Sequence, residues 1–375
     1  MLTGEIPFNN QFVFEMASFW DNGVMFLIAI GFIYLAIEKG FEPLLLITIA
    51  AGIMLANIPF SGLAEEDGFL VLLKRIGLDT ELFPLLMFLG LGALTDFTAL
   101  IQRPTMALLG AAAQIGIFGT LIGAIALGFS LDNAGAIAII GGADGPTAIF
   151  VAVTLAPDLL GPIAISAYSY MAMVPLIQPP IMRFLTTEQE RNVVMLYEPK
   201  PVPKIVRLLF PLVILIVAVL VAPKSTPLIG MFMFGNLLRE SGVVDRLAST
   251  AQNELINITT ILLGLTVGGT MVADRFLNPE TLMIFMLGLI AFTVATASGV
   301  LFGKIMYLVS GRQINPLLGA AGVSAVPMSA RVVQKVALET NPNNYLIMPA
   351  MGPNVAGVLG SAIAAGIIIK MCQLG

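Results

Sequence analysis

Long uncharged stretches alternate along this chain with short polar or charged ones. Apolar runs such as 104–131, 159–182, 282–303 and 345–369 contain no charge, and each can cross a hydrocarbon core of about 30 Å, which takes roughly 20 helical residues. The chain lacks the alternating polarity of barrel strands. The pattern therefore predicts an all-α polytopic membrane protein with helical segments at 24–37, 43–57, 83–101, 104–131, 134–156, 159–182, 205–222, 226–238, 254–274, 279–309, 315–336 and 345–370.

Composition narrows the chemistry that the chain can perform. Apolar residues make up 58% of it and charged residues 11%, against about 45–50% and about 25% in soluble domains. There is no histidine, and Cys372 is the single cysteine, so a thiolate cluster and an imidazole metal site are excluded. The remaining carboxylate, hydroxyl, amide and backbone oxygens suit a hard cation such as Na⁺.

Two halves of the chain resemble each other. A polar, basic linker at 183–204 separates an N-terminal half, 1–182, from a C-terminal half, 205–375. The Gly/Ala-rich stretch around Pro146 recurs around Pro327, and Tyr170 falls opposite Asn354 at nearly the same separation. Any two apolar sequences align to some extent, but landmarks kept in order favour true repeats.

Basic residues predict how these halves are oriented. The positive-inside rule places the linker 183–204 in the cytoplasm. If segments 134–156 and 315–336 re-enter the membrane instead of crossing it, each half has an odd number of crossings. The halves are then inverted repeats whose broken, re-entrant helices meet near the bilayer midplane, as in many secondary transporters.

The first break carries the most informative residue of the chain. Residues 140–147 read Ile-Gly-Gly-Ala-Asp-Gly-Pro-Thr, and glycine and proline inside an apolar segment interrupt a helix. Broken backbone at membrane depth is tolerated where it lines a cavity or is buried in protein. Asp144 stands at the break, and a carboxylate at that depth is a functional candidate by default. The alternative is that Asp144 only caps the half-helix that starts at Pro146.

Three further polar residues complete a candidate cation site. Ser324 lies in the second break, which runs from Asn315-Pro316 to Pro327, and Tyr170 and Asn354 lie in the segments that follow the two breaks. If both breaks reach the midplane, these side chains join Asp144 as oxygen donors for a monovalent cation. Taken singly, each of the three is equally well explained by hydrogen bonding between helices.

Arg331 follows the second break by one turn. Its planar guanidinium suits a carboxylate ligand, while the alternative is an ordinary cytoplasmic basic residue.

The motif Gly141-Gly142-Ala143-Asp144-Gly145-Pro146-Thr147, together with Asn315-Pro316, Gly319, Ser324 and Arg331, resembles the β subunit of the biotin-dependent, sodium-pumping decarboxylases. The resemblance covers essentially the whole chain. It implies that Asp144, Tyr170, Ser324 and Asn354 bind Na⁺. It also implies that Asn315, Gly319 and Arg331 serve carboxybiotin, with Arg331, Asn315 and Tyr170 taking part in its decarboxylation.

The resemblance also implies partners and a setting. A carboxyltransferase subunit would load CO₂ onto the biotin of a carrier protein, and this chain would decarboxylate carboxybiotin while exporting Na⁺. A small single-span membrane subunit, a homotrimer and an elevator-like core in the bacterial inner membrane are expected, and nucleic acid is not a partner. The chain's length is closer to that of the acyl-CoA members than to that of the oxaloacetate one. The rival function is a secondary Na⁺/carboxylate symporter or Na⁺/H⁺ antiporter, which shares such architecture.

Overall fold

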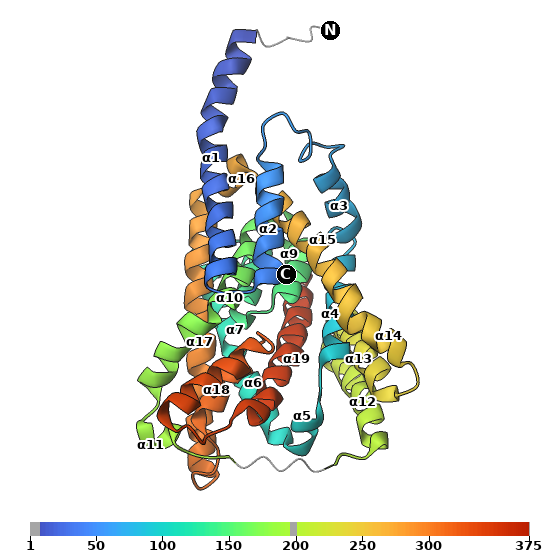
Figure 1. Ribbon diagram of the computed structural model, residues 1–375, viewed down its shortest axis with the longest axis vertical. Helices are drawn as coiled ribbons and strands as arrows, with labels where there is room; N and C mark the ends of the chain where they lie inside the picture. The colour runs from blue at the N-terminus through green and yellow to red at the C-terminus, as the bar shows by residue number, and fades with distance from the viewer. Residues whose placement is uncertain (1–7, 196–200, 375) are drawn as a thin grey trace. The chain divides into compact units, whose positions relative to one another are not determined.

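A computed structural model describes residues 8–195 and 201–374, with the side chains of 8–19 and 274–275 left out. Across these residues the regular elements are all helices (Figure 1). Residues 196–200 of the predicted linker lie outside the described residues.

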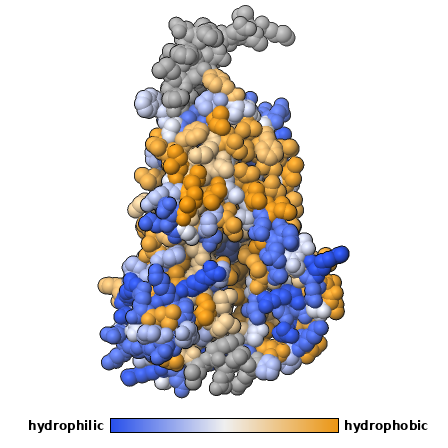
Figure 2. All heavy atoms as spheres, viewed as in Figure 1, coloured by the Kyte–Doolittle hydropathy of each residue, from blue (hydrophilic) through white to orange (hydrophobic). Residues whose placement is uncertain are grey.

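Six helical stretches among the described residues are long and apolar enough to cross a membrane. The shorter helices Phe69–Gly77 and Leu82–Leu94 would make a seventh if they form one span. Hydrophobic side chains cover much of the visible surface (Figure 2), as expected of helices solvated by lipid. The prediction of a polytopic membrane protein is confirmed. The six stretches are Trp20–Glu38, Pro104–Ala126, Pro157–Leu185, Lys204–Val221, Pro279–Val309 and Ile347–Cys372.

The chain divides into two compact units, which are described separately. This division rests on compactness, so the predicted repeats 1–182 and 205–375 stay a prediction. Unit 1 comprises residues up to Thr80 and Thr260–Met283. It holds α1 (Phe8–Glu38), α2 (Pro43–Ala56), α3 (Phe69–Gly77), the end of α15 (Ile256–Gly269), α16 (Ala273–Phe276) and the start of α17 (Pro279–Val309).

Small residues and one asparagine hold unit 1 together. A Cβ atom on Gly268 would lie 2.1 Å from the carbonyl oxygen of Ile49, so α2 and α15 approach as closely as glycine permits. Asn57, buried at the end of α2, donates to Met271 O (2.8 Å) and accepts from Ala273 N (3.0 Å). These bonds satisfy the backbone where α15 has ended and α16 begins.

Unit 2 comprises Glu81–Thr259 and Ile284–Gly375 and contains both predicted breaks. Its N-terminal elements are α4 (Leu82–Leu94), α5 (Thr98–Gln102), η1 (Pro104–Met106), α6 (Ala107–Ala113), α7 (Ile115–Ala126), α8 (Leu131–Ala138), η2 (Ile139–Gly142), α9 (Gly145–Leu155), η3 (Pro157–Leu159), α10 (Leu160–Leu185) and α11 (Glu188–Arg191). The later ones are α12 (Lys204–Val221), η4 (Pro223–Ser225), α13 (Thr226–Ser241), α14 (Asp245–Thr250), the π-helical η5 (Ala251–Leu255), the start of α15, most of α17, η6 (Pro316–Gly322), α18 (Met328–Thr340) and α19 (Ile347–Cys372).

Several expected segments form single helices, and others are interrupted. Segments 159–182, 205–222, 279–309 and 345–370 match α10, α12, α17 and α19 closely. The expected segment 83–101 instead unwinds after Leu94 and resumes at Thr98. Here polar side chains replace the helical hydrogen bonds.

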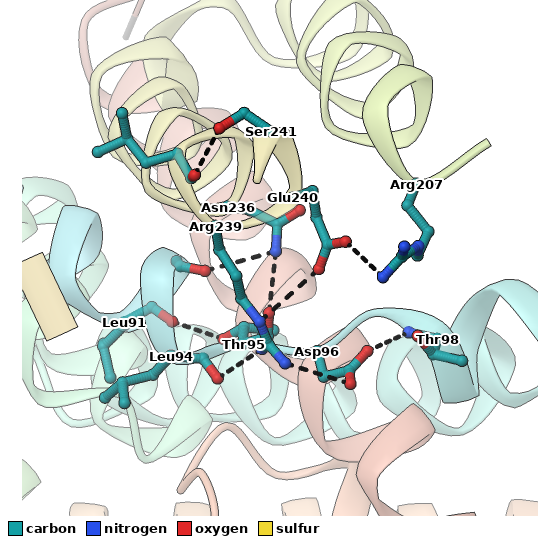
Figure 3. Close-up of polar contacts among 12 residues, drawn as sticks. Leu91, Leu94, Thr95, Asp96, Thr98, Arg207, Asn236, Arg239, Glu240 and Ser241 are labelled. Carbon is teal, nitrogen blue, oxygen red and sulfur yellow. Dashed lines mark hydrogen bonds and ion pairs between the residues drawn. The ribbon is translucent and has the colours of Figure 1, made fainter. Parts of the chain in front are cut away.

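The end of α4 is held by side chains from α13 (Figure 3). The Arg239 guanidinium donates to Leu94 O (3.0 Å) and pairs with Asp96 (3.3 Å), and Asn236 donates to Thr95 O (2.9 Å). The last carbonyls of a helix have no partner within the helix, so these contacts complete α4.

Glu240 extends this polar cluster toward α12, because it pairs with Arg207 at 3.0 Å. Burial alone would raise the pKa of Asp96, but hydrogen bonds from Thr98 and the charges of Arg239 and Arg207 outweigh it, so the pKa lies below its ordinary value. Asp96 is therefore held as a carboxylate at the end of α4.

The described part of the linker packs against the C-terminal helices. Arg183 pairs with Glu339 of α18 (2.5 Å), and Lys304 of α17 pairs with Glu190 (3.4 Å) and donates to Leu185 O (3.0 Å). The last turn of α10 and the residues that follow it are thus fixed to α17 and α18.

Candidate functional site

The first break has the backbone that its sequence predicts. Helix α8 gives way to the 3₁₀ turn η2, Ala143 adopts a left-handed conformation with φ of 51°, and α9 begins at Gly145. Asp144 is extended and is the N-cap of α9, accepting a hydrogen bond from Thr147 N through Oδ1 (3.1 Å). The capping interpretation is thus correct for one carboxylate oxygen.

The second carboxylate oxygen of Asp144 has a different partner. The Ser361 hydroxyl of α19 donates to Oδ2 at 2.6 Å. Asp144 is 5% exposed, and in the part of the chain that the structure describes no lysine or arginine pairs with it. A buried charge normally requires a compensating charge, so this carboxylate has the surroundings of a cation or proton site.

The second break contacts the first one. The 3₁₀ helix η6 ends at Gly322 and α18 starts at Met328, with irregular backbone between them. Ser324 N donates to Gly142 O at 3.1 Å. The Ser324 hydroxyl oxygen is buried and has no hydrogen-bond partner among the described residues, which leaves it available as a ligand.

Asn354 of α19 holds the second break through hydrogen bonds to its backbone. Its fully buried amide nitrogen donates to Val323 O (2.8 Å), Ala321 O (3.0 Å) and Ala325 O (3.4 Å), while its Oδ1 atom has no partner within the described chain. The interpretation of Asn354 as a hydrogen-bonding residue is correct for the amide nitrogen. The amide oxygen remains a candidate ligand for the cation.

One face of α19 therefore serves both breaks. Asn354 contacts the second break and Ser361, two helical turns later, contacts the first. Gly357 lies between them, and a Cβ atom there would be 2.3 Å from Gly322 O. Only glycine at this position allows the broken backbone to lie so close to the helix.

Tyr170 of α10 lies at the edge of this arrangement. Its hydroxyl donates to Phe285 O of α17. A Cβ atom on Gly288 would meet both the Tyr170 ring (2.5 Å) and Ile140 (3.0 Å), which places the ring beside the start of the first break. Tyr170 thus borders the site, with its hydroxyl engaged by α17.

Asn315 and Gly319 have structural surroundings of their own. The fully buried Asn315 caps η6 by accepting from Leu317 N (3.0 Å), and it donates to the linker carbonyls of Val193 (2.8 Å) and Arg191 (3.0 Å). A Cβ atom on Gly319 would lie 1.9 Å from Gly299 O of α17. These two residues fix η6 to the linker and to α17.

Arg331 stands apart from the buried oxygens. Its side chain is exposed on α18, and no carboxylate of the described residues pairs with it. The structure thus brings Asp144, Ser324 and Asn354 together around the two breaks, with Tyr170 at their edge, and leaves Arg331 accessible.

Two buried polar residues that contact the breaks, Ser361 and Gln178, were not singled out from the sequence. Ser361 lies among alanine and glycine on α19, where a small residue usually means helix packing; its spacing from Asn354 was the available signal. Gln178 of α10 is fully buried and donates to Ala320 O of η6 (2.9 Å). Its position before Pro179-Pro180, in the uncharged stretch 159–182, marks it only weakly.

Chemically, the oxygens gathered here are of the kind that bind a hard monovalent cation. One carboxylate, a hydroxyl and an amide oxygen lie where two non-helical segments meet, and such ligands suit Na⁺ more than a transition metal. Among the described residues, no group of three or more His, Cys, Asp or Glu side chains is placed to hold a metal ion.

Comparison with known proteins agrees with this chemistry. The chain is 55% identical over 350 residues to the methylmalonyl-CoA decarboxylase subunit beta of Veillonella parvula, covering 93% of each protein. It is 53% identical over 352 residues to the glutaconyl-CoA decarboxylase subunit beta of Acidaminococcus fermentans, covering 94% of this chain and 93% of that one. It is 49% identical over 413 aligned residues to the probable oxaloacetate decarboxylase beta chain of Vibrio cholerae, covering 94% and 95%.

The match to the family extends over nearly the whole molecule. Residues 21–372 match the family described as the Na⁺-transporting oxaloacetate decarboxylase beta subunit. This range contains both breaks and every candidate site residue discussed above. The chain therefore belongs to the family of beta subunits of the Na⁺-transporting decarboxylases.

Proposed function

We propose that this chain is the membrane subunit of a biotin-dependent decarboxylase and couples the decarboxylation of carboxybiotin to Na⁺ export across the bacterial inner membrane. The observation that carries the proposal is the buried Asp144 carboxylate, which lies without a basic partner where two broken segments meet in a member of this family. Na⁺ is the transported substrate, and carboxybiotin arrives on a partner protein.

The Na⁺ site comprises Asp144, Ser324, Asn354 and Tyr170. Ser324 and Asn354 have buried oxygens without hydrogen-bond partners in the described chain. A single carboxylate makes the site neutral when Na⁺ is bound, which lowers the cost of burying the ion. The Tyr170 hydroxyl, bound to Phe285 O, would have to change its acceptor to join them.

The carboxybiotin end of the pathway is assigned to Arg331, Asn315 and Gly319. Arg331 is exposed and can hold the carboxylate of carboxybiotin through two parallel hydrogen bonds. Asn315 and Gly319 fix η6, the element before the second break. An apolar pocket favours loss of CO₂, because the charged reactant gives neutral products.

The decarboxylation consumes one proton. The bond between the ureido nitrogen and the carboxyl carbon breaks, its electron pair stays on nitrogen, and a proton adds there. Asp144 can bind either Na⁺ or a proton in its buried site. A proton from outside that displaces Na⁺ at Asp144 would support both Na⁺ release and, by transfer toward biotin, decarboxylation. Tyr170 is the candidate donor along that route.

We extend the proposal to architecture and partners. Halves 1–182 and 205–375 are inverted repeats joined by the cytoplasmic linker 183–204, and segments 134–156 and 315–336 re-enter the membrane. The contact between Ser324 N and Gly142 O supports a meeting of the two segments. The proposed partners are a biotin carrier, a carboxyltransferase subunit and a small single-span membrane subunit, and the proposed assembly is a trimer that works as an elevator.

Reconstitution tests the proposed function. We expect radioactive Na⁺ to cross proteoliposome membranes only when a carboxylated biotin carrier is added, with CO₂ released in parallel. The control is the same carrier without the carboxyl group. Uptake of Na⁺ with a carboxylate solute, or exchange of Na⁺ for protons in the absence of carboxybiotin, would instead identify a secondary transporter.

A further inference from the structure

Ser361 contacts the proposed cation site from α19, the helix that also carries Asn354. Its hydroxyl oxygen is fully buried, 2.6 Å from Asp144 Oδ2 and 2.9 Å from Val358 O, one turn earlier in α19. Gly142 makes room for it, since a Cβ atom there would lie 3.3 Å from Ser361 Cβ. Ser361 thus lies against the first break and its carboxylate.

The two contacts of this hydroxyl are alternatives. A serine hydroxyl has one proton to donate and two lone pairs that accept. When the proton points to Asp144, it stabilises the carboxylate. When it points to Val358 O, a lone pair faces the carboxylate oxygen only 2.6 Å away. Two oxygens that face each other in this way repel, unless a cation binds both of them.

We propose that Ser361 is a further oxygen ligand of the Na⁺ site, and that its hydroxyl turns from Asp144 to Val358 O when Na⁺ binds. This inference rests on the proposed function, because it requires Na⁺ at Asp144. Without the cation, the hydroxyl takes over part of the stabilisation of the carboxylate. With the cation, the same oxygen coordinates it.

The placement of α19 agrees with this role. The helix brings Asn354 to the second break and Ser361 to the first, so one rigid element supplies an oxygen from each side of the meeting point. Rigid elements hold ligand oxygens more precisely than loops. A ligand at residue 361 therefore also couples Na⁺ binding to the position of α19 against both breaks.

Removal of the hydroxyl tests the proposal. The midpoint of thermal unfolding of the purified chain in detergent is titrated with NaCl against choline chloride, which controls for ionic strength. Ser361→Ala should raise the Na⁺ concentration for half-maximal stabilisation on the order of ten-fold, about 1.4 kcal/mol. It should also lower the unfolding temperature without Na⁺, because the hydrogen bond to Asp144 is lost. Ser361→Cys, which keeps nearly the same volume with a softer atom, should show the same loss.

A matched control separates this from a general effect of a missing hydroxyl. Ser166 is also fully buried in a helix, and its hydroxyl donates to Pro162 O in the same helix (2.7 Å). Ser166→Ala should leave the Na⁺ concentration for half-maximal stabilisation at the wild-type value.

The outcomes also distinguish this inference from the proposed function. One outcome is that Na⁺ stabilises the wild type but not Asp144→Asn, while Ser361→Ala needs the same Na⁺ concentration as the wild type for half-maximal stabilisation. This outcome refutes the role of Ser361 and leaves the proposed function standing. The role is likewise refuted if Ser361→Ala only lowers the unfolding temperature equally with and without Na⁺. If Na⁺ has no specific effect on the wild type, both proposals fail.

Discussion

Gly319 offers a prediction whose size follows directly from a distance. A Cβ atom on it would lie 1.9 Å from Gly299 O and 2.7 Å from Val300 N, whereas ordinary contacts start at 3.4 Å. These are backbone atoms of α17 and cannot rotate away, so Gly319→Ala must move η6 from α17 by about 1.5 Å. Such overpacking costs roughly 1–3 kcal/mol, and the stiffer unfolded chain of the alanine variant recovers about 0.4–1 kcal/mol of it.

The expected result is an unfolding midpoint lowered by a few degrees, since about 1 kcal/mol shifts it by roughly 2–4 °C in chains of 150–250 residues. Gly299→Ala clashes with the same contact from the opposite side, because its Cβ atom would meet Gly319 O at 2.2 Å. Gly299→Ala should lower the unfolding midpoint by a similar amount. The double variant should lower it by less than the sum of the two single shifts. Differential scanning fluorimetry in detergent measures all three.

Gly119→Ala is the matched control, since Gly119 lies in α7 with no atom within 4 Å of its missing Cβ. Its midpoint should stay unchanged or rise, because alanine favours a helix by about 1 kcal/mol. A Gly319→Ala variant with the wild-type midpoint and lost carboxybiotin turnover would refute the packing argument. Gly319 would then act directly at carboxybiotin.

Three further predictions concern the surroundings of the breaks. Asn354→Leu should lower the free energy of unfolding by about 1–3 kcal/mol, because it removes two good hydrogen bonds to the second break at roughly 0.6–1.7 kcal/mol each. An unfolding temperature equal to that of the wild type would contradict this. Arg331→Lys should lower carboxybiotin turnover, because lysine lacks the planar fork. It should leave the NaCl concentration for half-maximal stabilisation unchanged. A loss of Na⁺ binding as large as the loss of turnover would contradict the assignment of Arg331 to carboxybiotin. Because the pKa of Asp96 is lowered in the folded state, its carboxylate stabilises the fold above the ordinary carboxyl pKa of about 4 and loses this effect as pH falls below it. Asp96→Asn should therefore unfold earlier than the wild type at pH 7, with a difference that shrinks in acid; a difference independent of pH would show that the charge is not responsible.

The two breaks could be predicted from the sequence because glycine and proline act locally. Residues 141–146 place three glycines and a proline around Asp144, and these residue types weaken a continuous helix, so Asp144 could be recognised at a break. The same reasoning located the second break between Pro316 and Pro327. Local chemistry therefore indicates the two breaks without knowledge of the tertiary contacts.

Other features depend on contacts between elements that are distant in sequence, and the local residue pattern does not predict these contacts. Ser361 is one small residue in a helix of small residues until α19 lies beside Asp144. Asn315 was assigned to carboxybiotin by resemblance, and the structure shows its side chain against the linker carbonyls of Arg191 and Val193. The interruption of segment 83–101 similarly depends on Arg239, which is distant in sequence.

The exchange of Asp144 for asparagine tests the account most directly. Asparagine keeps the N-cap of α9, because its side-chain oxygen can still accept from Thr147 N, and it removes the charge that Na⁺ requires. Na⁺ uptake and CO₂ release are measured together in proteoliposomes supplied with a carboxylated biotin carrier. The account predicts that Asp144→Asn inserts and folds but shows neither Na⁺ transport nor Na⁺-stimulated decarboxylation. Normal Na⁺-stimulated turnover with Na⁺ transport in this variant would contradict it.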